Sequence, residues 1–143
     1  MAVLVHRGAM AAGGRGGAET RVRPVSATPE RFSDARTALE GALEDRGRAP
    51  DGFPNALATM WTWVSKSRAE GDRVLADVLA PVLRRDPDEL RAQVCVGPAE
   101  HCAELLSRYA EAGCERVYLW PLGDEKRQLE LVAETVTPQI QRR

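Results

Sequence analysis

The sequence predicts an α/β fold in which parallel strands alternate with helices. Two segments rich in aromatic and β-branched residues, 55–65 and 115–120, carry apolar side chains on both faces, as strands buried in a parallel sheet do. Helical spacing fills the stretches before, between and after these two segments. Strands separated by helices are typical of βα units, but two strands alone make no stable sheet. We therefore expect a parallel sheet that needs further strands.

Composition excludes several functional classes. The chain has 143 residues, 43% of them hydrophobic and 29% charged, with a formal net charge of -1. This balance argues against a nucleic-acid-binding protein, which would carry a basic surface. The sequence contains no apolar run long enough for a membrane span and no signal peptide. We expect a cytoplasmic protein.

Residues 1–23 differ from the rest of the chain. They hold five of the twelve glycines, with four arginines against one acidic residue and no hydrophobic period. Such a segment buries too little apolar surface to offset the entropy lost on ordering. We expect residues 1–23 to be disordered and residues 24–143 to form the folded domain.

The first predicted helix covers residues 29–46. Thr28 is a good N-cap, Pro29 suits the first helical position and Gly47 suits the C-terminal end. A Pro/Gly-rich loop, 48–54, then leads into the strand at 55–65. A further strand is possible around residues 21–25.

Helical signals dominate residues 67–93. Ser67 can cap a helix that reaches Val82 and that Pro81 kinks or ends. Asp86 followed by proline begins a short helix. We interpret Val94–Gly97 as a short apolar link.

Two more helices enclose the second strand. Pro98 begins a helix that ends at Gly113, with a core face made by Cys102, Leu105, Leu106 and Tyr109. The strand at 115–120 and the loop at 121–124 follow. The last helix runs from about 125 to 140, with Leu129, Val132, Val136 and Ile140 on one face.

Three motifs resemble the C-terminal end of the luciferase-like monooxygenase family. The first is Pro24–Phe32, PVSATPERF, and the second is Val96–Gly113, VGPAEHCAELLSRYAEAG. The third is Val117–Asp124, VYLWPLGD, together with Gln128–Leu129 and Val136–Pro138. These enzymes are (β/α)8 barrels of the TIM type that use FMN or the deazaflavin F420.

The resemblance covers most of this chain but only the last part of a family member. A complete barrel takes roughly 250 residues, so the resemblance implies an incomplete barrel with two or three parallel strands and helices on one side. It implies a flavin- or F420-dependent oxidoreductase that is truncated and inactive alone. The alternative is a non-catalytic α/β interaction module derived from that barrel. In either case we expect self-association or pairing with a complementary barrel fragment.

The loop after the second strand is the predicted cofactor site, because barrel enzymes carry their chemistry at the carboxyl ends of strands. Trp120 could form a wall for a flat ring, Gly123 allows close backbone approach, and Asp124 begins the last helix. The structural alternative is that Trp120 packs and Asp124 is an ordinary N-cap. No catalytic constellation or metal-binding pattern is visible.

The other candidate site residues are better explained by structural roles. Trp61 and Trp63 share a strand face and could line a cofactor pocket, but core residues are the commoner case. We expect His101 to be solvated and Arg127 to form a surface ion pair. The three cysteines, Cys95, Cys102 and Cys114, match no metal or redox pattern and are interpreted as small buried residues.

Overall fold

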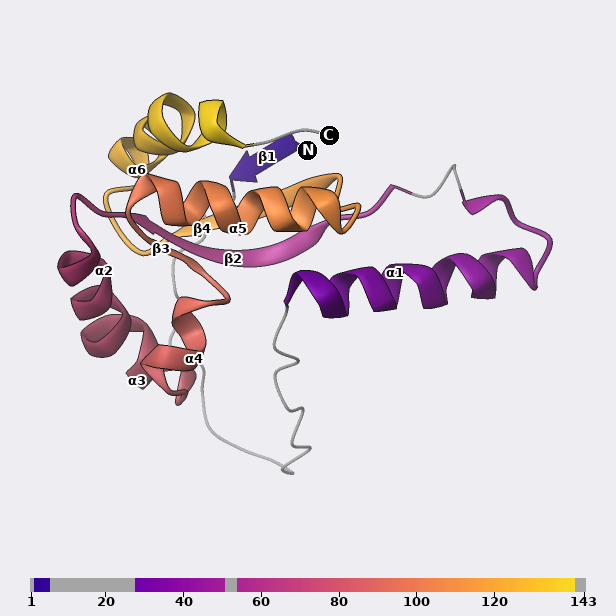
Figure 1. The fold of residues 1–143 in the computed structure, drawn as a ribbon, viewed down its shortest axis with the longest axis horizontal. Coiled ribbons are helices and arrows are strands. Elements are labelled where there is room, and N and C mark those ends of the chain that lie inside the picture. The colour runs from indigo at the N-terminus through magenta and orange to yellow at the C-terminus, as the bar shows by residue number, and fades with distance from the viewer. Residues whose placement is uncertain (1, 6–27, 51–53, 141–143) are drawn as a thin grey trace.

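A four-stranded parallel sheet with flanking helices forms the centre of the molecule (Figure 1). This computed structural model describes residues 2–5, 28–50 and 54–140. The strand order is β1-β4-β2-β3, with bounds Ala2–Val5 for β1, Arg116–Pro121 for β4, Leu57–Val64 for β2 and Cys95–Gly97 for β3. Every pairing is parallel. The predicted α/β class and the two predicted strands are therefore confirmed, whereas the expectation of two or three strands is wrong, because the described residues form four.

Strand β3 corrects the interpretation of Val94–Gly97 as a link. Cys95, Val96 and Gly97 pair with Thr62, Trp63 and Val64 at the carboxyl end of β2. A segment of three residues carries no period of its own. Its backbone becomes a strand only because the edge of β2 offers partners for its N–H and C=O groups.

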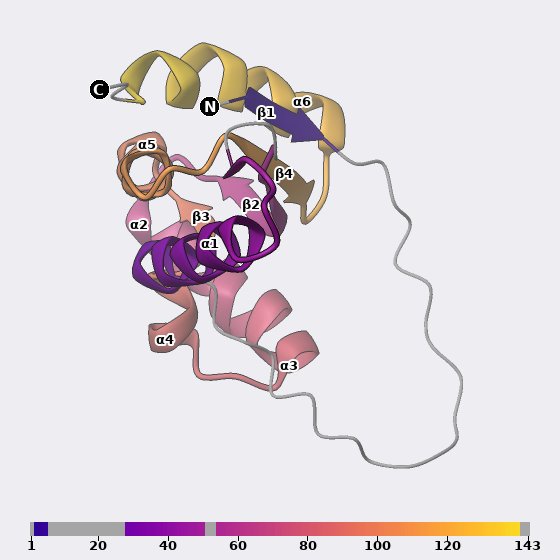
Figure 2. The ribbon, with the colours of Figure 1, turned by 90° about the vertical axis from the view of Figure 1, so that its right-hand side faces the viewer.

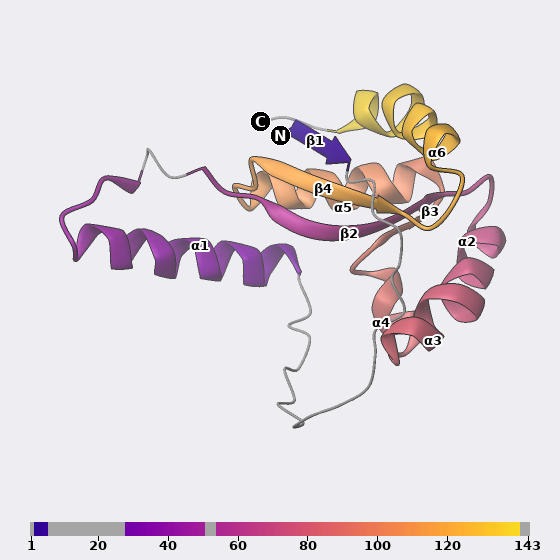
Figure 3. The ribbon, with the colours of Figure 1, turned by 180° about the vertical axis from the view of Figure 1, so that it is seen from behind.

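Strand β1 corrects the expectation of disorder, which is wrong for Ala2–Val5. These residues pair with Arg116–Leu119 of β4 (Figure 3). Composition over the whole of 1–23 hid a short apolar stretch, and β4 supplies the backbone partners that stabilise it. The other residues of 1–23 lie outside the described residues, as does the possible strand at 21–25.

Helix α1 spans Pro29–Glu44 and confirms the predicted first helix. The Thr28 hydroxyl accepts a hydrogen bond from the Arg31 N–H at 3.3 Å. The Phe32 ring packs edge-on against Tyr109 of α5 (Ala99–Glu111), with ring centroids 6.1 Å apart. This contact joins α1 to the core-facing side of α5, whose predicted core residues are all buried.

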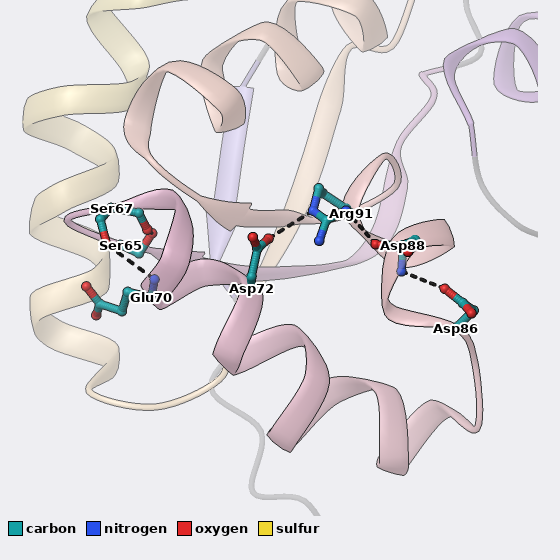
Figure 4. Close-up of polar contacts among 7 residues, drawn as sticks. All are labelled: Ser65, Ser67, Glu70, Asp72, Asp86, Asp88 and Arg91. Atoms are coloured by element: carbon teal, nitrogen blue, oxygen red, sulfur yellow. Dashed lines mark hydrogen bonds and ion pairs between the residues drawn. The ribbon is translucent and has the colours of Figure 1, made fainter.

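Short helices follow β2 along the chain. Ser67 caps α2 (Arg68–Val74), and α3 (Ala80–Leu83) and α4 (Pro87–Arg91) complete the group. Asp86 caps α4 through the Asp88 N–H at 2.7 Å. Figure 4 shows Arg91 between two carboxylates, 2.9 Å from Asp72 and 2.6 Å from Asp88. The contact with Asp72 joins α4 to α2, whereas the contact with Asp88 lies within α4.

Two π-helical turns each lie just before a proline. The turn η2 (Leu75–Leu79) precedes Pro81, and η3 (Val132–Val136) precedes Pro138 in the 3-10 turn η4 (Thr137–Gln139). Proline lacks an N–H and its ring clashes with the carbonyl four residues earlier. The wider π turn relieves both problems, so the helix does not end at Pro81 but continues to Leu83.

The first hydrophobic core lies between one face of the sheet and α5. Met60 and Val64 of β2 and Val117 and Leu119 of β4 are buried there. Residues of α5 and of the C-terminal helix, which begins as α6 (Glu125–Leu131), cover them. Figure 2 shows α5 and α6 together on this side.

The second core covers part of the opposite face. It contains Leu75, Leu79, Leu90 and Val96, with Trp61 and Trp63 packed partly against it. Figures 1 and 2 place α2–α4 on this side, away from α6. Helices on both faces correct the expectation that they would lie on one side only. The physical reason is that η2 and α4 bury their leucines against Val96 and the tryptophans.

Among the residues that the structure describes, no helix has the length and apolar character needed to cross a membrane.

Candidate functional site

A hollow lies at the carboxyl ends of β2 and β3 and beside the start of α6. Its volume is about 840 Å³. We call it the strand-end pocket; its lining comes from the end of β2 (Trp63, Val64, Ser65, Lys66), from α2 (Glu70), from the start of α5 (Pro98, Ala99, Glu100) and from the C-terminal helix with its N-cap (Asp124, Arg127, Gln128, Leu131, Glu134, Thr135, Pro138, Gln139). Sites in open α/β sheets occur at this end of the strands.

Asp124 lies at the mouth of this pocket. It occupies the N-cap position of α6 with φ 39°, but its side chain makes no capping hydrogen bond. Asp124 therefore occupies the N-cap position, as the structural alternative stated, but it does not make the hydrogen bond of an ordinary N-cap. A non-glycine residue in the left-handed region is strained, and such strain concentrates at functional sites. The exposed carboxylate of Asp124 is left available to a ligand.

Trp120 lies in β4, and Gly123 lies in the loop between β4 and α6. The half-buried Trp120 ring packs edge-on against Trp61, with centroids 5.5 Å apart and planes at 78°. Trp120 is not among the residues that line the strand-end pocket. A Cβ added to Gly123 would lie 3.6 Å from Cζ3 of Trp63. Of the predicted site residues, only Asp124 lines the pocket directly, while Gly123 approaches it through Trp63.

Trp63 belongs to both the second core and the strand-end pocket. It packs partly against the second core, as favoured from the sequence, and also lines the pocket. Its Nε1 is buried, and no described residue accepts a hydrogen bond from it. A buried donor without an acceptor is costly, so this nitrogen gains from an acceptor supplied by another molecule.

Gln128 is a buried pocket residue that the sequence analysis did not predict as part of a site. Only 3% of it is exposed, and its side-chain amide contacts the backbone of Val64 at the end of β2. Its Oε1 accepts from the Val64 N–H at 2.6 Å and its Nε2 donates to the Val64 carbonyl at 3.3 Å. Its spacing could have indicated that it is buried, because Gln128 lies on the same helix face as Val132 and Val136, which are buried.

Charged side chains around the pocket are mostly exposed. Arg127 pairs with Glu130 at 3.3 Å, which confirms the predicted surface ion pair. Glu70 accepts a hydrogen bond from the Lys66 N–H at 3.1 Å. The rim therefore combines the cations Lys66 and Arg127 with the carboxylates Glu70, Glu100, Asp124 and Glu134.

The cysteines and His101 do not contribute to this site. All three cysteines are free and buried, as expected. Contact with the Cys102 thiol and burial raise the pKa of Cys95, and burial raises the pKa of Cys114. Both therefore stay as unreactive thiols at neutral pH. His101 is half-buried beside Gly97, and the expectation of a solvated ring is wrong. Within the described ranges, no group of histidine, cysteine and acidic residues could hold a metal ion.

Comparison with known proteins finds a similar solved structure but no matching sequence family. No family model matches the chain, and no curated protein matches it. Among solved structures, it is similar to the coenzyme F420-dependent tetrahydromethanopterin reductase from Methanopyrus kandleri, with a TM-score of 0.61 and 17% identity. The match covers 80% of this chain and 43% of the reductase chain. The chain thus spans less than half of that reductase, and its fold is that of part of a (β/α)8 barrel of the TIM type.

Proposed function

We propose that this chain is the C-terminal part of a luciferase-like oxidoreductase of the cytoplasm, which uses F420 or a flavin such as FMN to transform a small molecule. The observation that carries the proposal is the structural likeness to an F420-dependent reductase over 80% of the chain. The position of the strand-end pocket supports it, because enzymes with such sheets bind ligands outside the carboxyl ends of the strands.

The residues at this end suit the ring of such a cofactor. Trp63 offers a flat apolar surface and a buried N–H that lacks an acceptor, and the rings of FMN and F420 both carry carbonyl oxygens. Gly123 leaves room beside Trp63. The rim carries more carboxylates than cations, so it suits the neutral ring better than the phosphate. The reduced cofactor would supply a hydride or the electrons that activate oxygen.

This chain supplies only part of the walls such a cofactor needs. It covers 43% of the reductase chain, and a site that lacks walls loses contact area and must be ordered on binding. We therefore expect no saturable binding of F420 or FMN at micromolar concentration. Weak binding of either cofactor at the strand-end pocket should still occur at millimolar concentration.

Nuclear magnetic resonance titration tests the proposal. The ¹⁵N-labelled chain is titrated with F420 and with FMN, and amide shifts are followed at each concentration. We expect progressive shifts confined to Trp63–Lys66, Gly123–Arg127 and the indole N–H of Trp63. Adenosine monophosphate, which has a phosphate but no flavin ring, is the control ligand. Shifts that are absent, scattered over the surface or equal with the control would contradict the proposal.

A second candidate function is a non-catalytic α/β interaction module. It is favoured by the open sheet, whose outer strands β1 and β3 each have one neighbour among the described strands. Open edges are sites where another chain can add a strand. This function requires association without any response to F420 or FMN, so the same titration separates the two candidates.

A further inference from the structure

The hydrogen bonds between β2 and β4 stop short of the end of β2. The register runs to Thr62 opposite Pro121, and the Leu122 N–H then donates to the Thr62 carbonyl at 3.0 Å. Beyond Leu122 the chain turns through Gly123 and the left-handed Asp124 into α6. No backbone of β4 therefore remains opposite Val64, although Val64 presents its N–H and C=O in the same direction as Thr62.

The side chain of Gln128 takes the place of that missing backbone. Its carboxamide offers one acceptor and one donor in the arrangement of a peptide group. Val64 uses both, donating its N–H to Oε1 at 2.6 Å and accepting from Nε2 at 3.3 Å. Both bonds are buried, so their loss would leave unpaired backbone groups away from water.

The same residue fixes the start of α6. The Gln128 N–H donates to the Asp124 carbonyl at 2.9 Å, a bond of the first turn of the helix. Gln128 is thus held to Asp124 by its backbone and to Val64 by its side chain. Val64, Ser65 and Lys66 form one wall of the strand-end pocket, and Asp124 and Arg127 form part of another.

We propose that Gln128 is a positioning residue that substitutes for a β-strand backbone and sets the separation between the two walls of the strand-end pocket. This inference rests on the proposed function only in taking the pocket as a ligand site. Of the standard side chains, glutamine alone matches the requirement here. Glutamate lacks the donor when ionised, methionine lacks both groups, and asparagine is shorter by one methylene.

Three variants separate positioning from simple packing. Gln128→Met keeps the length and volume but removes both hydrogen bonds, and Gln128→Glu keeps the shape. Gln139→Met is the matched control, since Gln139 lines the same pocket but is exposed and donates only to the Thr135 carbonyl within its own helix. Melting temperature and far-UV circular dichroism identify any variant that fails to fold.

Hydrogen exchange at the Val64 amide is the first readout. We expect Gln128→Met to lower its protection factor by roughly ten- to a hundredfold, because the bond that protects it is lost. The amides of Ser65, Lys66 and residues 123–127 should shift as well, and Gln139→Met should change neither the protection of Val64 nor these shifts. Unchanged protection of Val64 in folded Gln128→Met would overturn the proposal. Lost protection with unmoved pocket amides would also overturn it, by showing that the bonds do not position the walls.

Gln128→Glu provides a conservative rescue. A protonated carboxyl group both donates and accepts, as the amide does, whereas the ionised form only accepts. At acidic pH we expect wild-type protection of Val64 and wild-type amide shifts around the pocket. As the new carboxyl ionises, its bond to the Val64 carbonyl is lost and the pocket amides should shift, whereas the carboxylate still accepts from the Val64 N–H and keeps that amide protected. The charged groups that face it from the surrounding elements, and that will influence its titration, are Lys66, Glu70, Glu100, Asp124, Arg127 and Glu134. Absence of rescue in a variant that remains folded would count against the proposal.

Titration with F420 and FMN is the last readout. We expect the cofactor-induced shifts of the wild-type chain to be weakened several-fold in Gln128→Met. If the wild-type chain itself responds to neither cofactor, the proposed function fails. The exchange and rescue measurements still decide the role of Gln128 in that case, because they need no ligand.

Discussion

Replacement of Gly71 by alanine probes the tightest backbone contact at the carboxyl end of the sheet. Gly71 lies within α2 and is buried. A Cβ at this position would lie 2.8 Å from the Cα of Gly97 and 3.3 Å from the Gly97 nitrogen, both backbone atoms of β3. It would also lie 3.3 Å from the Ser65 hydroxyl. The helix must therefore move away from the strand, or β3 must shift on β2.

Two opposing effects decide how far Gly71→Ala changes the free energy of unfolding. Alanine is favoured over glycine within a helix by about 0.8–1 kcal/mol. Forcing an extra carbon into a packed interior costs about 1–3 kcal/mol, and here the obstacle is backbone that cannot rotate aside. We expect Gly71→Ala to lower the free energy of unfolding by about 1 kcal/mol. This is a substantial part of the stability of a small domain.

Gly41→Ala is the matched control. Gly41 is also within a helix, α1, but nothing lies within 4 Å of a Cβ added there. Only the propensity effect then applies, so this variant should raise the free energy of unfolding by about 0.5–1 kcal/mol. Urea unfolding followed by tryptophan fluorescence and circular dichroism gives both values. Equal stabilisation by the two substitutions would refute the close packing of α2 on β3.

Three other perturbations have defined outcomes. Leu106 is 1% exposed, so Leu106→Ala should lower the free energy of unfolding in urea by about 2–5 kcal/mol. Val82 is 53% exposed, so Val82→Ala should change that free energy by no more than about 0.5 kcal/mol. Asp124→Gly should raise stability by about 0.5–1 kcal/mol by relieving the left-handed backbone, while weakening cofactor-induced shifts; a destabilised variant would argue against strain there. Because burial and thiol contact raise the pKa of Cys95 and burial raises that of Cys114, the unfolded thiols lose protons first, and stability should fall as pH rises above about 8.5. Urea midpoints that stay constant between neutral pH and pH 10 would contradict this.

Helix boundaries and the main strands were predictable because their signals are local. Thr28, Ser67 and Asp86 cap their helices as expected. The apolar face of α5 is likewise complete in the sequence. These features depend on side-chain period and capping chemistry, which a single sequence contains.

The remaining features depend on neighbours that are distant in sequence. Cys95–Gly97 becomes a strand through the edge of β2, and Ala2–Val5 through the edge of β4. Gln128 is buried because β4 ends opposite Thr62 and leaves Val64 without a backbone partner. Asp124 carries no capping bond because its backbone adopts the left-handed region. Each outcome is set by tertiary contact, which overrides the local signal.

The state of association of the purified chain, measured by light scattering together with cofactor titration, tests the central claim most directly. If the chain is part of a barrel, its open sheet edges and incomplete site should give dimers or larger species whose share rises with concentration. Neither F420 nor FMN should then saturate the chain at micromolar concentration. A monomer at every concentration that binds either cofactor stoichiometrically would contradict the account and identify a small enzyme that is complete in itself.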